Sequence, residues 1–168
     1  MEHLLAERAA RLGLKIANAY GPEGIDLPLH IEAQYWNGNG FVTNRADSCT
    51  RLLASDFALS GFRGGLSGCK AALSVPGSGR LTAGVGTARV LTGKVSGSIS
   101  ISVNLIGSGG ASCAARGAAN AGTATGAARP WLLGKWAGSR KYDRNPSANV
   151  TFGIQHGADR VIQIREVF

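Results

Sequence analysis

The feature that most constrains the fold is a stretch of strict alternation that ends in two Asn-Gly pairs. Within residues 27–36, apolar side chains alternate with mostly polar ones. The apolar side holds Leu27, Leu29, Ile31, Ala33 and Tyr35, and the other side holds His30, Glu32, Gln34 and Trp36. A period of two predicts a β-strand with one face suited to a core. Residues 37–40 (NGNG) supply the positive-φ residues of a tight turn, and residues 41–43 start a return strand that residues 47–50 end. The segment 27–50 therefore predicts a β-hairpin.

Other segments supply strands for this hairpin to pair with. The alternation is cleanest over residues 95–106, where Ser and Asn alternate with apolar residues, as in a sheet with one dry and one wet face. Weaker patterns at 13–20, 69–75, 80–93, 148–155 and 160–167 are divided by Gly, Pro and Asn turn signals. We predict an all-β, antiparallel β-sandwich-like domain, with the long Gly/Ala/Ser-rich segments 61–68 and 107–129 as loops.

The length and the first residues bear on domain organisation. A chain of 168 residues is long enough for one domain with its own core, so residues 12–168 are predicted as a single β domain. Residues 1–11 are predicted as a short helical lead-in or a fragment boundary, because Leu4, Leu5 and Ala9 fall on one side of an amphipathic helix. This segment lacks the apolar region of a secretory signal, so the protein is either cytosolic or a piece of a longer exported chain. No apolar run approaches the ~18 to 20 residues of a membrane span.

The basic character of the chain raises the question of anionic partners. The net charge is +8, and the densest basic run lies in residues 129–144. It contains Arg129, Lys135, Arg140, Lys141 and Arg144, interleaved with Trp131, Trp136 and Tyr142. Basic and aromatic side chains together can hold single-stranded nucleic acid. Because no nucleic-acid motif accompanies the run, we expect a solvated loop with core-facing tryptophans and no specific nucleic-acid partner.

Residues that could carry chemistry are few and scattered. His3, His30 and His156 lack the spacing of a zinc site, so no metal is expected. Ser48 and Cys49 would need a neighbouring base to act as nucleophiles, and the sequence nominates none. The Gly-rich residues 107–110 are not followed by the Gly-Lys-Ser/Thr of a phosphate loop. We therefore expect neither a cofactor nor enzymatic activity.

The three cysteines, Cys49, Cys69 and Cys113, allow three single pairings, each of which leaves one thiol free. Cys49 and Cys69 are the favoured disulfide candidates, and their short loop implies a contribution of about 3 kcal/mol. Cys113, in the segment predicted as a flexible loop, would then be free or pair with another chain.

Several runs of residues carry a family resemblance. They are residues 14–21 (LKIANAYG), 27–29 (LPL), 34–38 (QYWNG), 41–44 (FVTN), 47–50 (DSCT), 130–132 (PWL), 145–148 (NPSA), 151–154 (TFGI) and 160–168. Together they resemble the C-terminal, DUF6701-like domain of exported bacterial MshQ-like proteins, which are associated with the mannose-sensitive haemagglutinin (MSHA) type IV pilus. The resemblance spans nearly the whole chain from about Leu12 and is weakest from about Leu52 to Arg129. The family commonly has two acidic residues before Ser-Cys-Thr, where this chain has Ala46-Asp47, which weakens any metal role there.

The resemblance implies export to the pilus or the outer cell surface as the terminal domain of a longer chain, a part in pilus assembly or adhesion, and no known catalytic residues. Two function classes follow. One is a structural or adhesive module that contacts pilin-like or minor pilin proteins. The other is a glycan-binding sandwich, in which Trp36, Trp131 or Trp136 would stack on sugar rings. Trp131 and Trp136 are expected in the core, so Trp36, beside His30, Glu32 and Gln34, gives the candidate ligand-binding residues. A solvent-exposed tryptophan beside polar groups would favour glycan binding, whereas buried tryptophans and a flat apolar edge would favour assembly.

Overall fold

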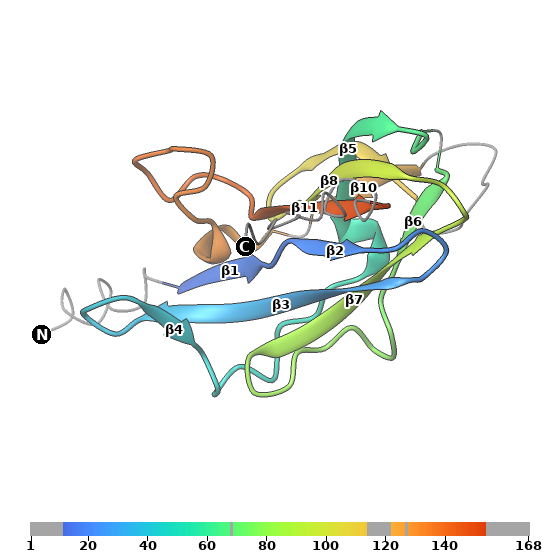
Figure 1. The fold of residues 1–168 in the computed structure, drawn as a ribbon. Helices are drawn as coiled ribbons and strands as arrows, with labels where there is room; N and C mark the ends of the chain where they lie inside the picture. The colour runs from blue at the N-terminus through green and yellow to red at the C-terminus, as the bar shows by residue number, and fades with distance from the viewer. Residues whose placement is uncertain (1–11, 68, 114–121, 127, 154–168) are drawn as a thin grey trace, which may run out of the picture.

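The computed structural model describes residues 12–67, 69–113, 122–126 and 128–153, and these form two sheets (Figure 1). Sheet I contains, in spatial order, β1 (Leu12–Ile16), β3 (Leu27–Trp36), β7 (Val85–Thr92) and β6 (Ala71–Ser74), while β4 (Phe41–Thr43) pairs with β3. Sheet II contains β10 (Gly122–Thr125), β9 (Ser108–Ser112), β5 (Phe57–Gly64), β8 (Gly97–Val103), β11 (Ser147–Phe152) and β2 (Ala19–Gly21). Two 3-10 helices, η1 (Ala54–Asp56) and η2 (Pro130–Leu132), lie between strands. The predicted all-β, sandwich-like fold is confirmed.

Strand pairing is antiparallel in both sheets except between β2 and β11, which run parallel. The segment predicted as one strand, residues 13–20, is two strands that belong to different sheets. The chain leaves sheet I after Ile16 and enters sheet II at Ala19, so this segment connects the two layers.

The predicted hairpin is confirmed with its register. Gln34 lies opposite Thr43, and Trp36 lies opposite Phe41. In the turn, the Asn37 amide donates to the Gly40 carbonyl at 3.0 Å. The Asn37 side-chain oxygen accepts hydrogen bonds from the backbone N–H groups of residues 39 and 40 at 2.9 and 3.0 Å. The local sequence therefore supplies both the geometry and the hydrogen bonds of this turn.

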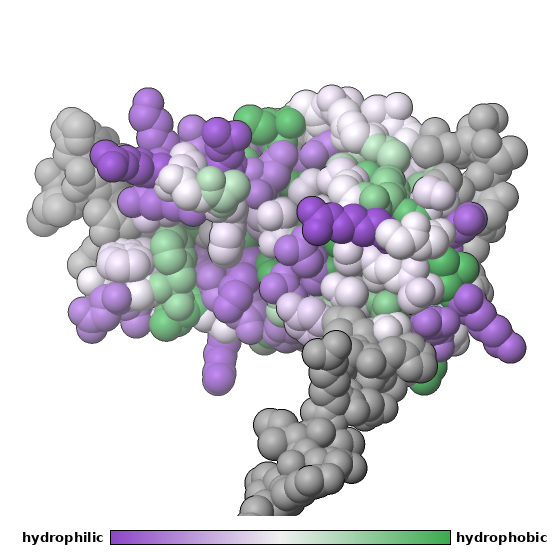
Figure 2. Space-filling view, turned by 45° about the horizontal axis from the view of Figure 1, so that its top comes forward, coloured by the Kyte–Doolittle hydropathy of each residue, from purple (hydrophilic) through white to green (hydrophobic). Residues whose placement is uncertain are grey.

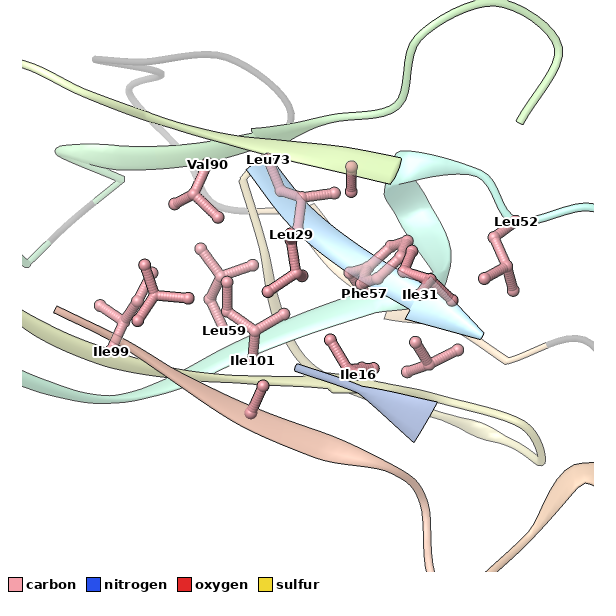
Figure 3. Close-up of a cluster of buried hydrophobic side chains, with 14 of the residues drawn as sticks. Ile16, Leu29, Ile31, Leu52, Phe57, Leu59, Leu73, Val90, Ile99 and Ile101 are labelled. Carbon is pink, nitrogen blue, oxygen red and sulfur yellow. The ribbon is translucent and has the colours of Figure 1, made fainter. Parts of the chain in front are cut away.

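The hydrophobic core lies between the facing sides of the two sheets (Figure 3). Sheet I contributes Leu29, Ile31 and Val90, and sheet II contributes Phe57 and Ile101, each no more than 2% exposed. The alternation of β3 and β8 has the expected result, because alternate residues of both strands enter this core and the intervening ones face outward. The outer face of sheet I is consequently available for function.

Two segments predicted as loops contain strand structure. β5 continues through Gly64, inside the Gly-rich segment 61–68, and both β9 and β10 lie within residues 107–129. The prediction failed because strands pair through backbone N–H and C=O groups, which residues with small side chains supply as well as any others. Ala124 of β10 is fully buried, and Ala111 of β9 lies opposite Leu59 of β5. The predicted N-terminal helix and the strand at 160–167 lie outside the described residues.

The disulfide joins Cys69 to Cys113, so the predicted pairing of Cys49 with Cys69 is wrong. Cys69 precedes β6 of sheet I and Cys113 follows β9 of sheet II, so the bond links the two sheets. Both sulfurs belong to buried residues, and the backbone N–H of Leu73 donates to the Cys113 carbonyl at 2.7 Å. Cys49 is an exposed free thiol. The favoured pairing rested on loop length, and the strand β9 that brings Cys113 to β6 was not predicted.

The part of the chain that the structure describes contains no helix long and apolar enough to span a bilayer.

Candidate functional site

The four residues predicted to bind a ligand lie in one row on the outer face of β3. His30, Glu32, Gln34 and Trp36 are two residues apart, and the pleat places them on the side opposite the core. The neighbouring strands extend the row, since Lys15 of β1 lies opposite Glu32 in the register. His30 is exposed, whereas the other three are half-buried. The sequence pattern was therefore sufficient to bring these residues together.

The polar part of this row consists of His30, Glu32 and Gln34, and we call it the polar row. Glu32 is its centre. One carboxylate oxygen lies 2.9 Å from His30 Nε2, and the other accepts a hydrogen bond from Gln34 Nε2 at 3.0 Å and from Thr43 Oγ1 at 3.4 Å. The hydrogen bond with His30 lowers the pKa of Glu32, partial burial opposes this, and Gln34 and the charge of Lys15 lower it further. The carboxylate is thus held ionised by its own neighbours. Because Gln34 uses its amide nitrogen here, its carbonyl oxygen is left as an acceptor.

Beyond Gln34 the row becomes aromatic. The Trp36 and Phe41 rings meet edge to face with centroids 5.4 Å apart, as expected for a cross-strand pair. Phe41 in turn lies 6.1 Å from the ring of Tyr142, and the ammonium of Lys135 lies 4.8 Å from the Tyr142 centroid in a cation–π contact. Residues far apart in the sequence therefore form one aromatic cluster.

The residues from outside the hairpin come from one loop, Gly134–Arg144, which we call the aromatic–basic loop. Its ends are fastened by two backbone hydrogen bonds between Gly134 and Arg144, at 3.0 and 3.1 Å. The indole of Trp136 packs closely against Gly134, where an added Cβ would be 2.2 Å from Trp136 Nε1. Within the loop, the Ser139 hydroxyl donates to Asp143 at 2.6 Å. These contacts fix the position of Trp136 and Tyr142.

The hairpin and the aromatic–basic loop enclose a hollow of about 190 Å³, which we call the aromatic pocket. It is lined by Gly13, Gln34, Phe41, Gly134, Lys135, Trp136 and Tyr142. The absence of a side chain at Gly13 leaves room in the pocket, with the Phe41 ring 3.6 Å from where a Cβ would stand. Trp36 supports the wall through Phe41. The pocket is smaller than the ~300 Å³ lower bound of drug-sized sites, so its size suits a single ring.

Sequence reasoning missed Phe41, Lys135 and Tyr142 as site residues, and it preferred a core position for Trp136 over a place in the site. It noted the basic and aromatic run but predicted core-facing tryptophans, which is wrong for Trp131. That side chain is 52% exposed, because η2 turns Leu132 and Leu133 into the core and leaves Trp131 outside. Trp136 is half-buried in the pocket wall. The sequence signal that could have identified these site residues was the interleaving of cationic and aromatic residues, which does not follow the period of a strand.

The Asp47-Ser48-Cys49-Thr50 motif has a structural role in the fold. The Asp47 carboxylate accepts hydrogen bonds from the backbone N–H groups of Cys49 and Thr50 at 3.0 and 2.9 Å and from the Thr50 hydroxyl at 2.6 Å. Burial raises the pKa of Asp47, but these three bonds outweigh it and the pKa is lowered. Ser48 accepts a bond from the Ala83 backbone at 3.2 Å, which ties this turn to the loop before β7. The motif therefore closes the hairpin segment.

Within the described residues no three or more His, Cys, Asp or Glu side chains gather as a metal site.

Comparison with known proteins gives a family match. A sequence model described as the fourth domain of DUF6701 matches residues 11–167, almost the whole chain. No curated protein and no solved structure matches the chain significantly. The matched range contains the hairpin, both disulfide cysteines and the aromatic–basic loop, and the chain belongs to the DUF6701 fourth-domain family.

Proposed function

We propose that this domain is a non-catalytic binding module of an exported cell-surface protein, and that its aromatic pocket binds one sugar ring of a glycan. The observation that carries the proposal is the enclosure of a ring-sized hollow by Phe41, Trp136 and Tyr142, with the amide of Gln34 in its wall. A pyranose has apolar C–H faces and a rim of hydroxyl groups. Aromatic faces and edges match the former, and an amide carbonyl matches the latter.

The polar row supports the same function. Glu32 orients Gln34 through the 3.0 Å hydrogen bond, so the amide is positioned before a ligand arrives. Trp36 restrains Phe41 in the same way through their ring contact. A pocket whose walls are already ordered loses little side-chain entropy on binding.

Export is supported by the disulfide, because such bonds persist in oxidising compartments and are rare in the cytosol. The resemblance to MshQ-like proteins extends the proposal to an outer-surface location in an MSHA-like type IV pilus system. In that setting a glycan-binding domain would act in adhesion.

A second candidate function is assembly with pilin-like or minor pilin proteins. One observation favours it, namely an open hollow at the end of sheet I lined by Leu12, Tyr35 and Val42 among other residues. Tyr35 is 42% and Val42 is 36% exposed, although both lie on the core side of their strands. On the face seen in Figure 2, hydrophobic residues reach the surface in separate patches among hydrophilic ones. The apolar area at Tyr35 and Val42 suits a protein contact of modest size.

A glycan-array screen of the oxidised domain tests the first candidate. Binding should be saturable, strongly reduced in Trp36→Ala and Trp136→Ala, and retained in Trp131→Ala. Trp131 is the matched control because it is exposed and does not line the pocket. Absence of binding to every glycan, or an equal loss in Trp131→Ala, would contradict the pocket assignment and favour assembly. Pull-downs of minor pilins with Tyr35→Asp and Val42→Asp variants would then test the second candidate.

A further inference from the structure

We infer that the aromatic pocket selects a sugar ring that carries a carboxylate, such as a uronic acid, and that Lys135 pairs with this group. The inference rests on the proposed glycan-binding function and specifies its ligand class. It follows from the charges around the pocket, which are unevenly distributed between the polar row and the aromatic–basic loop.

Lys135 supplies an uncompensated cation in the pocket wall. Its ammonium lies 4.8 Å from the Tyr142 ring centroid, which restrains a side chain that would otherwise be mobile. Among the described residues no carboxylate lies within 4 Å of it. An ammonium is a compact charge with three hydrogen-bond donors, and it suits a single carboxylate at the edge of a ring.

The remainder of the aromatic–basic loop has the same sign. It carries Arg140, Lys141 and Arg144 besides Lys135, and its one carboxylate is Asp143. Asp143 already accepts a hydrogen bond from Ser139 and lies 3.7 Å from Arg144 Nε. The loop therefore presents positive potential to an approaching glycan, which raises the local concentration of acidic sugars.

On the β3 side of the pocket, Glu32 hydrogen-bonds to the lining residue Gln34, and the surroundings of this carboxylate reduce its repulsion of an acidic ligand. His30 lies 2.9 Å from one oxygen of Glu32, Gln34 and Thr43 donate to the other, and Lys15 lies opposite in the register. The two walls thus differ in charge. A bound ring would direct its carboxylate to Lys135 and a hydroxyl group to the carbonyl oxygen of Gln34.

The test compares two oligosaccharides that differ only in the C6 group, galacturonic acid trimer and galactose trimer, by calorimetric titration. We expect the acidic trimer to bind roughly tenfold more tightly, the effect of one charge-assisted hydrogen bond. Lys135→Gln should remove this preference, so that the variant binds the acidic and the neutral trimer with equal affinity. Lys70→Gln, an exposed lysine outside the pocket, is the matched control and should behave like the parent. The preference should also shrink between about 0.05 and about 0.5 M salt.

The outcomes separate the inference from the function on which it rests. Equal binding of both trimers would overturn the acidic ligand class while glycan binding stands. A preference that persists in Lys135→Gln, or one that falls equally in Lys70→Gln, would overturn the role of Lys135. No binding of either trimer or of any glycan on the array would overturn both.

Discussion

Removing the disulfide should destabilise the fold strongly, because the bond closes a long loop and both of its cysteines lie in the hydrophobic core. The bond joins residues 44 apart in the sequence, and closing a loop of that length corresponds to about 4 kcal/mol of unfolding free energy. The pairing favoured from the sequence, Cys49 with Cys69, would close only about 20 residues and contribute about 3 kcal/mol. The double variant Cys69→Ala/Cys113→Ala removes the bond without leaving buried thiols.

Equilibrium unfolding in urea, followed by tryptophan fluorescence and circular dichroism, measures this effect. With an m-value of about 2 kcal/mol/M, a loss of about 4 kcal/mol moves the midpoint by about 2 M. The m-value itself should rise, because the unfolded chain expands once the cross-link is absent. The reduced parent retains both sulfur atoms, so comparing it with the double variant separates the cross-link from the lost packing of two buried residues.

Cys49→Ala is the matched control, because Cys49 is exposed and unpaired with any other cysteine. Its unfolding free energy should stay within about 0.5 kcal/mol of the parent. Two results would refute the reasoning. One is a double variant as stable as Cys49→Ala, and the other is peptide mapping that finds Cys49 in the bond.

Three further predictions concern the turn, the pocket and the polar row. Asp47→Ala removes a carboxylate that accepts three hydrogen bonds, and urea unfolding should show a loss of about 1 to 2 kcal/mol. Gly134→Ala places a Cβ 2.2 Å from Trp136 Nε1, so it should cost about 1 to 3 kcal/mol of unfolding free energy and abolish glycan binding. Gly13→Ala meets Phe41 at an ordinary 3.6 Å, so its unfolding free energy should stay close to that of the parent. Glu32→Gln should flatten the dependence of stability on pH, measured by unfolding at a series of acidic pH values. The folded-state pKa of Glu32 is lowered, so its contribution is present above the unfolded pKa of about 4.3 and is lost as the pH falls through the folded value.

Each of these predictions has an outcome that contradicts it. Asp26→Ala removes an exposed carboxylate that makes no hydrogen bond within the described residues, and a loss equal to that of Asp47→Ala would argue against the turn. Equal unfolding midpoints for the two glycine variants would argue against tight packing of Trp136. An unchanged acid slope in Glu32→Gln would mean that its hydrogen bonds do not hold the carboxylate ionised.

The parts of the fold that could be predicted are those where side-chain pattern alone determines the outcome. The alternation of β3 places Leu29 and Ile31 in the core and Glu32 outside, and the Asn-Gly turn sets the register with Phe41. β9 and β10 could not be predicted in this way, because Gly, Ala and Ser leave no periodic contrast. Their place in sheet II depends on backbone hydrogen bonds to neighbours that are distant in sequence.

The same distinction explains the site and the disulfide. His30, Glu32, Gln34 and Trp36 share a face because they lie two residues apart on one strand, so the sequence alone was enough to identify this row. Trp136 and Tyr142 reach the row through a loop whose path depends on Gly134 and on tertiary contacts, and no local rule brings them to Phe41. The partner of Cys69 depends in turn on β9, whose position follows from the sheet order.

The cross-link between the sheets also determines how this domain would respond to tension. Cys69 precedes β6 and Cys113 follows β9, so the loop that the covalent bond closes contains all of β6, β7, β8 and β9. Because an extended chain spans at most about 3.3 to 3.6 Å per residue, the bond withholds about 150 Å of contour length from a chain pulled at points outside the loop. A surface protein that carries such a domain would extend less under shear flow, and a reductant would convert this short spacer into a longer one.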